Sequence, residues 1–189
     1  MQKINGLPQP AHLADVLKKF PKGMQHLLRF HDEILRTPSS LSLGERELLA
    51  AWVSSVNSCG FCAGIHARIA EMFGQDQNLI NSALQDLEHS AIPVAMKPIL
   101  AFAKKLTLTP AKMTPQDSEA IRAAGWDEQA IFDTVVVTSL FNLMNRIVEG
   151  TGVSIESTAD IDYGEAHKKR YLSETSYQDF GQDIGIMND

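Results

Sequence analysis

The sequence predicts an all-α protein. Apolar residues recur at helical spacing along most of the 189 residues, for example over residues 48–56. Two helix starts are marked by polar capping patterns, Ser42-x-x-Glu45 and Thr114-Pro115-x-Asp117. The alternation of apolar and polar residues that is typical of strands is not found in the sequence. Helices packed on helices are therefore the expected architecture.

The expected helices follow one another with short connections. Before the cysteines, the sequence predicts helices at 11–20, 23–36 and 42–56. The next helix starts at the cysteines and ends at Gly74, a typical C-terminal stop. Later helices are expected at 76–90, 94–108, 114–125, 127–149 and 164–175. Pro98 moves the expected start of the 94–108 helix towards its own position, because proline lacks a backbone donor.

The helix at 127–149 is apolar around more than one face. This pattern is typical of a central core helix, or of one that also packs between subunits. Asn142, Asn145 and Arg146 interrupt the apolar run and need polar partners. We expect them to serve the structure, by capping neighbouring helices across an interface; lining the functional site is the alternative.

The length is that of one domain with a good core, so a single domain over residues 1–189 is expected. Its central region is the stretch 45–73, which holds both cysteines, and residues from about 151 to 189 are expected to form an irregular arm. His31 and Asp32 are expected at the surface of their helix, whereas Trp52 and Trp126 are expected in the core.

Charge and hydropathy exclude several classes of function. The formal net charge is −6 without a block of like charges, which argues against a nucleic-acid surface. The N-terminal dozen residues lack the apolar run of a secretory signal. The longest apolar region, 131–148, is too polar to span a bilayer comfortably. We therefore expect a cytoplasmic protein that binds neither nucleic acid nor membrane.

Both cysteines of the chain lie in one C-x-x-C motif, Cys59 and Cys62. His66 follows Cys62 by four residues, and Glu47 precedes Cys59 by twelve residues on the expected preceding helix. No other stretch of the sequence gathers a nucleophile, a base and a carboxylate so closely. In a reducing compartment such a motif is more typical of a catalytic or metal site than of a structural disulfide. The pattern predicts a redox-active dithiol.

The spacing places this dithiol at the N-terminus of a helix. If Ser58 caps that helix, Cys59 and Cys62 both lie in its first turn, where a reversible disulfide is geometrically permitted. The partial positive charge of a helix N-terminus favours the thiolate, which is the nucleophilic form. His66 lies one turn further along and can accept the thiol proton. Glu47 is the best candidate to orient the imidazole, because a helical hairpin would bring it beside His66.

This combination resembles the alkylhydroperoxidase AhpD-like and carboxymuconolactone decarboxylase-like family. The family pattern is a glutamate, eleven residues, and then C-x-x-C-x-x-x-H, which Glu47, Cys59, Cys62 and His66 match in register. The similarity covers about residues 40–75. The later segment 141–153, FNLMNRIVEGTGV, resembles the peroxidase-related branch of the family.

The resemblance implies an AhpD-like helical fold and a thiol-dependent peroxidase that reduces alkyl hydroperoxides through a dithiol–disulfide cycle. Cys62 would be the peroxidatic cysteine, Cys59 the resolving cysteine, and His66 with Glu47 the proton relay. The implied partners are a hydroperoxide substrate and an external dithiol protein or small thiol; no cofactor or metal is implied. Family members form trimers or hexamers, which fits the apolar helix at 127–149.

One position departs from the family pattern. AhpD proteins have a second histidine directly before the second cysteine, where this chain has Phe61. That histidine belongs to the proton relay, so the link from Glu47 to His66 would here be direct, water-mediated or weaker. A physiological substrate other than a peroxide is an alternative consequence.

Three other interpretations stay open at this point. Two cysteines, a histidine and a glutamate are a reasonable zinc ligand set, although structural zinc sites usually draw on two separated ligand pairs. A carboxymuconolactone decarboxylase-like enzyme fits less well, since its chemistry needs no dithiol. A non-catalytic helical assembly protein would keep the fold with ordinary buried thiols.

Overall fold

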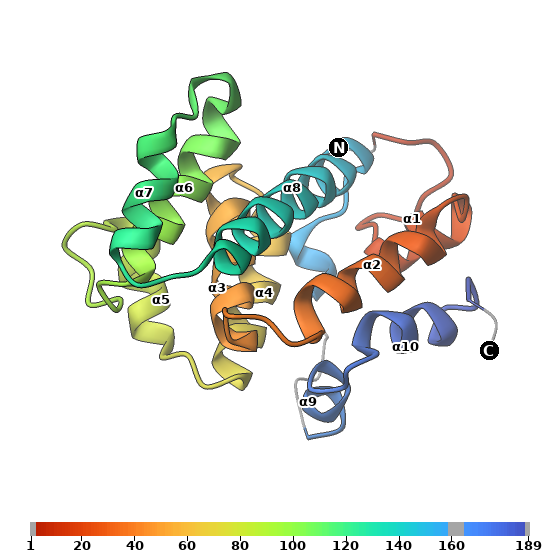
Figure 1. The fold of residues 1–189 in the computed structure, drawn as a ribbon. Helices are drawn as coiled ribbons and strands as arrows, with labels where there is room; N and C mark the ends of the chain where they lie inside the picture. The colour runs from red at the N-terminus through yellow and green to blue at the C-terminus, as the bar shows by residue number, and fades with distance from the viewer. Residues whose placement is uncertain (1–2, 159–164, 188–189) are drawn as a thin grey trace. The chain divides into compact units, whose positions relative to one another are not determined.

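The computed structural model describes residues 3–158 and 165–187 of the chain. Within these ranges it confirms the all-α prediction, and the only extended pairing is a single bridge between Ala11 and Val153 (Figure 1). The helices are α1 (Leu13–Lys19), α2 (Met24–Arg36), α3 (Leu43–Val56), α4 (Gly60–Met72), α5 (Gln77–Gln85), α6 (Met96–Leu108), α7 (Pro115–Ala123), α8 (Glu128–Thr151), α9 (Glu165–Tyr171) and α10 (Ser176–Asp183), with short 3₁₀ turns at Pro110–Lys112 and Ile155–Thr158.

The chain divides into two compact units. Unit 1 comprises residues 1–37 and 146–189, and unit 2 comprises residues 38–145. Helix α8 begins in unit 2 and its last residues, from Arg146 onward, belong to unit 1. The prediction of a single domain stays a prediction, and the two units are described separately below.

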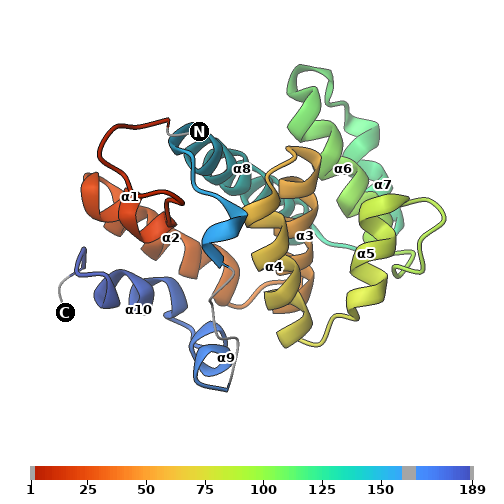
Figure 2. The same cartoon turned by 180° about the vertical axis from the view of Figure 1, so that it is seen from behind.

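Unit 2 is built around a hairpin of α3 and α4, which lie side by side in both views (Figures 1 and 2). Helix α6 packs on α3, α7 packs on α6, and α5 packs on both members of the hairpin. Helix α3 is buried around most of its circumference, with ten consecutive or nearly consecutive buried positions from Gly44 to Ser54. A helix that is apolar on nearly all sides must lie inside its unit, so α3 is the core helix of unit 2.

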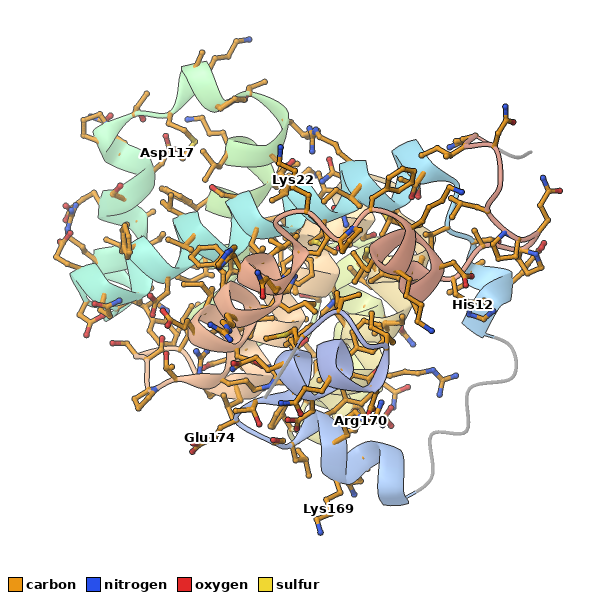
Figure 3. The ribbon with its side chains drawn as sticks, turned by 90° about the vertical axis from the view of Figure 1, so that its right-hand side faces the viewer. His12, Lys22, Asp117, Lys169, Arg170 and Glu174 are labelled. Carbon is orange, nitrogen blue, oxygen red and sulfur yellow. The ribbon has the colours of Figure 1, made fainter. Side chains whose placement is uncertain are left out.

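The predicted capping patterns both form. The Ser42 hydroxyl accepts from the Glu45 backbone N–H, and the Glu45 carboxylate accepts from the Ser42 N–H at 2.8 Å. Thr114 and Asp117, the latter labelled in Figure 3, make the same reciprocal arrangement at the start of α7. Lys105 donates to both oxygens of Asp117, and this hydrogen bonding holds the pKa of Asp117 below its ordinary value. These local bonds fix where the two helices begin.

Three helix boundaries differ from the prediction. Pro98 is the third residue of α6, where the missing N–H would have had no helical partner, so the helix starts just before it at Met96. Helix α5 ends at Gln85 rather than near residue 90, because the Asp86 side chain accepts from the Glu88 and His89 N–H groups and forms a turn. Helix α8 continues past Gly150, and the left-handed residue that follows it is Gly152.

Helix α8 carries more apolar surface than its own unit buries. By length and composition alone it would be able to cross a membrane, although core helices of water-soluble proteins pass the same test. Phe132 is 61% exposed and Leu143 is 47% exposed, whereas Phe141 on another face is 1% exposed. The helix thus has one face in the core and a second apolar face at the surface.

In unit 1, α2 and α10 pack together, and this contact corrects the prediction of an irregular C-terminal arm. Leu17, Leu28 and Met187 form the buried centre of the cluster between them. Gly181 allows this close approach, because a Cβ there would lie 2.5 Å from the Met187 sulfur and 2.8 Å from a Leu28 methyl group. Helix α9, whose Lys169 and Arg170 are labelled in Figure 3, agrees with the predicted charged helix.

The expectation that His31 and Asp32 lie at the surface is wrong. Both side chains are only 2% exposed. The Asp32 carboxylate accepts from the backbone N–H groups of Tyr177 and Gln178, both at 2.9 Å. It thereby satisfies donors at the start of α10 that have no partner within that helix. The reason for the error is that α10, which covers these residues, lies almost 150 positions later in the chain and was not predicted.

Candidate functional site

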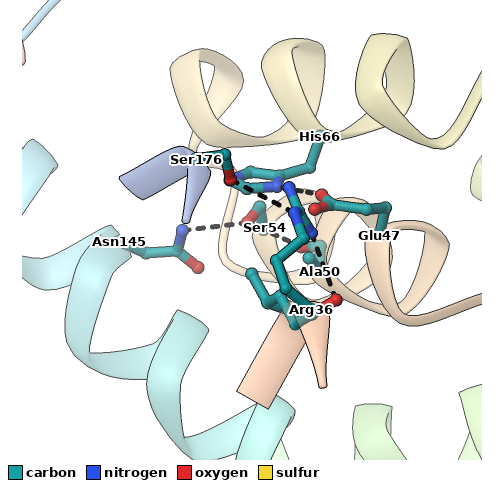
Figure 4. A network of polar contacts seen from close by, with 8 residues as sticks. Arg36, Glu47, Ala50, Ser54, His66, Asn145 and Ser176 are labelled. Atoms are coloured by element: carbon teal, nitrogen blue, oxygen red, sulfur yellow. Dashed lines mark hydrogen bonds and ion pairs between the residues drawn. The ribbon is translucent and has the colours of Figure 1, made fainter. Parts of the chain in front are cut away.

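The α3–α4 hairpin brings Glu47 and His66 into direct contact, as the sequence predicts. Glu47 lies on α3 and is fully buried, while His66 lies on α4 and is 7% exposed. The His66 Nδ1 atom and a Glu47 carboxylate oxygen are 2.6 Å apart (Figure 4). The phenylalanine at position 61 left open whether the link from Glu47 to His66 is direct, water-mediated or weaker. The structure has the direct link.

The charge state of Glu47 sets the direction of this bond. When Glu47 is ionised, its carboxylate only accepts hydrogen bonds, and the Nδ1 atom of His66 is the donor. The Nε2 atom of a neutral His66 is then the basic nitrogen, available to take a proton. A carboxylate beside the imidazole also stabilises the imidazolium that forms when it does so. Such a pair can serve as a general base whose imidazole is oriented by the carboxylate.

Phe141 of α8 covers the imidazole from one side. Its ring meets the His66 ring edge to face, with the centroids 4.4 Å apart and an angle of 79° between the planes. Such a contact holds the imidazole in one orientation and keeps water from this side of it. In a surrounding of low polarity the bond between His66 and Glu47 is stronger than it would be in water.

Both cysteines are reduced and buried, Cys59 fully and Cys62 with 4% of its surface exposed. Neither Asn57 nor Ser58, the two possible caps in the sequence, caps their helix. Cys59 itself is the N-cap of α4, and Ser58 stands before it in a left-handed conformation with φ of 57°. Cys62 is the third helical residue and lies in the first turn, as predicted. His66 is one turn after Cys62 on the same face of α4.

The turn between α3 and α4 has polar partners that the sequence did not identify as part of the site. The Cys59 N–H donates to the Ser54 carbonyl at 2.9 Å. The Ser54 hydroxyl accepts from the Asn145 side chain at 3.0 Å, as Figure 4 shows, and the Asn57 side chain donates to the Asn145 carbonyl oxygen at 2.9 Å. The only sequence signal for this contact was the polar interruption of an apolar helix by Asn142 and Asn145.

Metal-ligand groups and pockets outside the hairpin bear on whether the described part of the chain holds another ligand. No group of three or more His, Cys, Asp and Glu side chains suited to a metal ion occurs there. A surface pocket of about 510 Å³ lies between α5 and α6 and is lined by residues that include Trp52, Leu84, Lys104 and Leu108. Glu47, Cys59, Cys62 and His66 do not line it.

Comparison with known proteins agrees with this geometry. The family model of the carboxymuconolactone decarboxylase family matches residues 21–104, a range that includes the whole α3–α4 hairpin. A peroxidase-related protein from Silicibacter sp. TM1040 has a similar structure, with a TM-score of 0.70 and 25% identity over 75% of this chain and 74% of that one. The chain is thus similar to this family over residues 21–104, and it has an AhpD-like helical fold.

Further proteins are similar to this chain in structure or in sequence. The AhpD core of a peroxidase-related protein from Ralstonia eutropha JMP134 superposes with a TM-score of 0.69 at 24% identity, covering 73% of each chain. A protein from Agrobacterium tumefaciens described as a putative antioxidant defence protein AhpD has a TM-score of 0.62 at 19% identity, covering 82% of this chain and 97% of that one. The uncharacterised protein YdfG of Bacillus subtilis (strain 168) is 28% identical over 127 residues, 67% of this chain and 85% of its own. The two structures agree with this chain in fold.

Proposed function

We propose that the protein is a thiol-dependent peroxidase that reduces alkyl hydroperoxides through a Cys59–Cys62 dithiol–disulfide cycle. The observation that carries this proposal is the 2.6 Å bond between His66 and Glu47 on the hairpin that also holds both cysteines. A buried histidine oriented by a carboxylate, one turn from a cysteine at a helix N-terminus, is the arrangement that activates a thiol.

In the first step His66 takes the proton of the Cys62 thiol at its Nε2 atom. The thiolate attacks the terminal oxygen of the hydroperoxide, so an S–O bond forms while the O–O bond breaks. The leaving alkoxide receives the proton from the imidazolium and departs as the alcohol, and Cys62 becomes a sulfenic acid. Glu47 stabilises the imidazolium between the two proton transfers.

In the second step the Cys59 thiol attacks the Cys62 sulfur, and the disulfide forms as water leaves. An external dithiol then reduces the disulfide in two exchange steps and restores both thiols. The exposure of the two residues supports this division of roles, because Cys62 retains slight contact with solvent and Cys59 retains none. Oxidation follows access as well as thiolate character.

The partners and setting of this activity are also proposals. We propose a dithiol protein or small thiol as the reductant and the cytoplasm as the location. We further propose a homo-oligomer, a trimer or hexamer, that covers the exposed apolar face of α8 around Phe132 and Leu143. The exposed fractions of these two side chains support that assembly.

The test is steady-state consumption of an alkyl hydroperoxide with a dithiol reductant in excess. We expect Cys62→Ser to lower the rate by at least about 100-fold, because a hydroxyl is a far weaker nucleophile than a thiolate. Retained helicity by circular dichroism would show that the variant is folded. Undiminished consumption by Cys62→Ser would contradict the proposal.

A further inference from the structure

A chain of polar contacts joins the C-terminal end of α3 to α8 inside unit 2. The Asn145 side chain holds two residues of α3 at once: its N–H₂ group donates to the Ser54 hydroxyl at 3.0 Å, and its carbonyl oxygen accepts from Asn57 at 2.9 Å. The Asn57 side chain also lies 3.3 Å from the Asn142 carbonyl oxygen. Ser54 is fully buried and Asn145 is 2% exposed, so the bond between them is made away from water, while Asn57 is half-buried.

These contacts end at the first cysteine of the motif. Ser54 provides the backbone carbonyl that accepts from the Cys59 N–H at 2.9 Å, and Asn57 is the C-cap that follows the last residue of α3. Between Asn57 and Cys59 stands Ser58, whose left-handed backbone is uncommon for a residue other than glycine. Such a conformation persists where its surroundings fix it. On the N-terminal side of Ser58, the side chains of Ser54 and Asn57 are held by hydrogen bonds to Asn145.

A polar group buried in an apolar helix needs its partners, and an apolar side chain of similar size would remove that requirement. A purely structural role for Asn145 would be to hold α8 against α3. The contacts are more specific than that role requires, since both functional groups of one carboxamide are used on the few residues that set the position of Cys59.

We propose that Asn145 is a positioning residue for the Cys59–Cys62 dithiol. Acting through Ser54 and Asn57, it fixes the α3–α4 turn so that the Cys59 thiol is held ready to bond to Cys62. The inference rests on the proposed function for its use in catalysis, although the positioning itself is measurable without a peroxide.

The expected effect follows from conformational entropy. When the turn is fixed in the reduced protein, closing the disulfide orders little that is not already ordered. When the turn is loosened, the reduced form gains freedom that the disulfide form, constrained by its own bridge, does not share. Freeing about one residue is expected to lower the equilibrium constant for disulfide formation by about tenfold.

The test is a redox equilibrium with glutathione. Oxidised glutathione converts the dithiol to the disulfide and is itself reduced to two molecules of glutathione, so the ratio of the two forms gives the equilibrium constant. We would compare the parent with Asn145→Ala and with the milder Asn57→Ala. The matched control is Thr134→Val, on the same helix, because Thr134 is fully buried and its hydroxyl donates to the Ala130 carbonyl of α8 itself.

We expect the equilibrium constant for disulfide formation to fall about tenfold in Asn145→Ala and in Asn57→Ala. In Thr134→Val we expect it to stay within about twofold of the parent value. Folded asparagine variants with the parent constant would overturn the inference. If Asn145→Ala does not fold, Asn57→Ala alone decides in the same way. A parent that forms the disulfide with glutathione but consumes no hydroperoxide would contradict the proposed function alone, whereas an active parent with unchanged constants in the variants would contradict the positioning role alone.

Discussion

Among the residues that the structure describes, each unit buries one carboxylate, and the two carboxylates are bound by different kinds of donor. In unit 2, Glu47 is fully buried and meets the imidazole of His66. In unit 1, Asp32 is 2% exposed and meets the backbone N–H groups of Tyr177 and Gln178. Both carboxylates are hydrogen-bonded, as buried polar groups need to be.

The difference lies in what each partner is able to do with a proton. A backbone amide does not titrate in the range where proteins are folded, so Asp32 acts as a fixed cap that attaches the start of α10 to α2. Burial raises the pKa of Asp32 above its ordinary value, and the two amide bonds only partly oppose this. An imidazole, in contrast, gains and loses a proton near neutral pH. A buried carboxylate can therefore serve a structural or a catalytic role, and its hydrogen-bond partner distinguishes the two roles.

The largest expected effect is on the rate of hydroperoxide consumption. Replacing Glu47 by Gln keeps the shape of the side chain and removes the charge that stabilises the imidazolium, so we expect the rate to fall by at least about 100-fold. The matched change Asp32→Asn in unit 1 is expected to leave the rate unchanged, because its hydrogen-bond partners transfer no proton. Equal losses of rate in Glu47→Gln and Asp32→Asn would contradict the distinction between the two carboxylates.

A smaller effect is expected on the free energy of unfolding, and here Asp32 is the carboxylate whose replacement matters. Asp32→Ala leaves the Tyr177 and Gln178 N–H groups without their acceptor, which we expect to lower the free energy of unfolding by about 2 kcal/mol. Removing a carboxylate whose burial is unfavourable offsets part of that loss, but two unsatisfied donors outweigh it. Urea unfolding of Asp32→Ala beside Glu33→Ala, an exposed neighbour on α2, measures the difference. A variant as stable as the control would show that Asp32 does not hold α10.

Much of the fold was predictable because its signals are local. The Ser42–Glu45 and Thr114–Asp117 caps act over three residues, and the apolar stripe of α3 is read within one window of sequence. The contact between Glu47 and His66 was also predictable, because a short turn after α3 leaves a hairpin as the simplest arrangement and the spacing then sets the two side chains opposite each other.

What was not predictable depends on residues far apart in the chain. Helix α10 is short and weakly patterned, and its start is completed by Asp32, about 145 positions earlier. The Asn145 contacts with Ser54 and Asn57 likewise span about 90 positions. The left-handed Ser58 stands directly before Cys59, the N-cap of α4, and asparagine or glycine is more common than serine in such a backbone conformation.

The measurement that tests the central claim most directly is a thiol count on the pre-reduced native protein, before and after brief exposure to a stoichiometric alkyl hydroperoxide. The account predicts that the parent rapidly loses both of its thiols, and that Cys59→Ser stops at a sulfenic acid that is trapped on Cys62. Two thiols that persist in the parent would contradict the account, and the family would then describe the fold of this chain and not its chemistry.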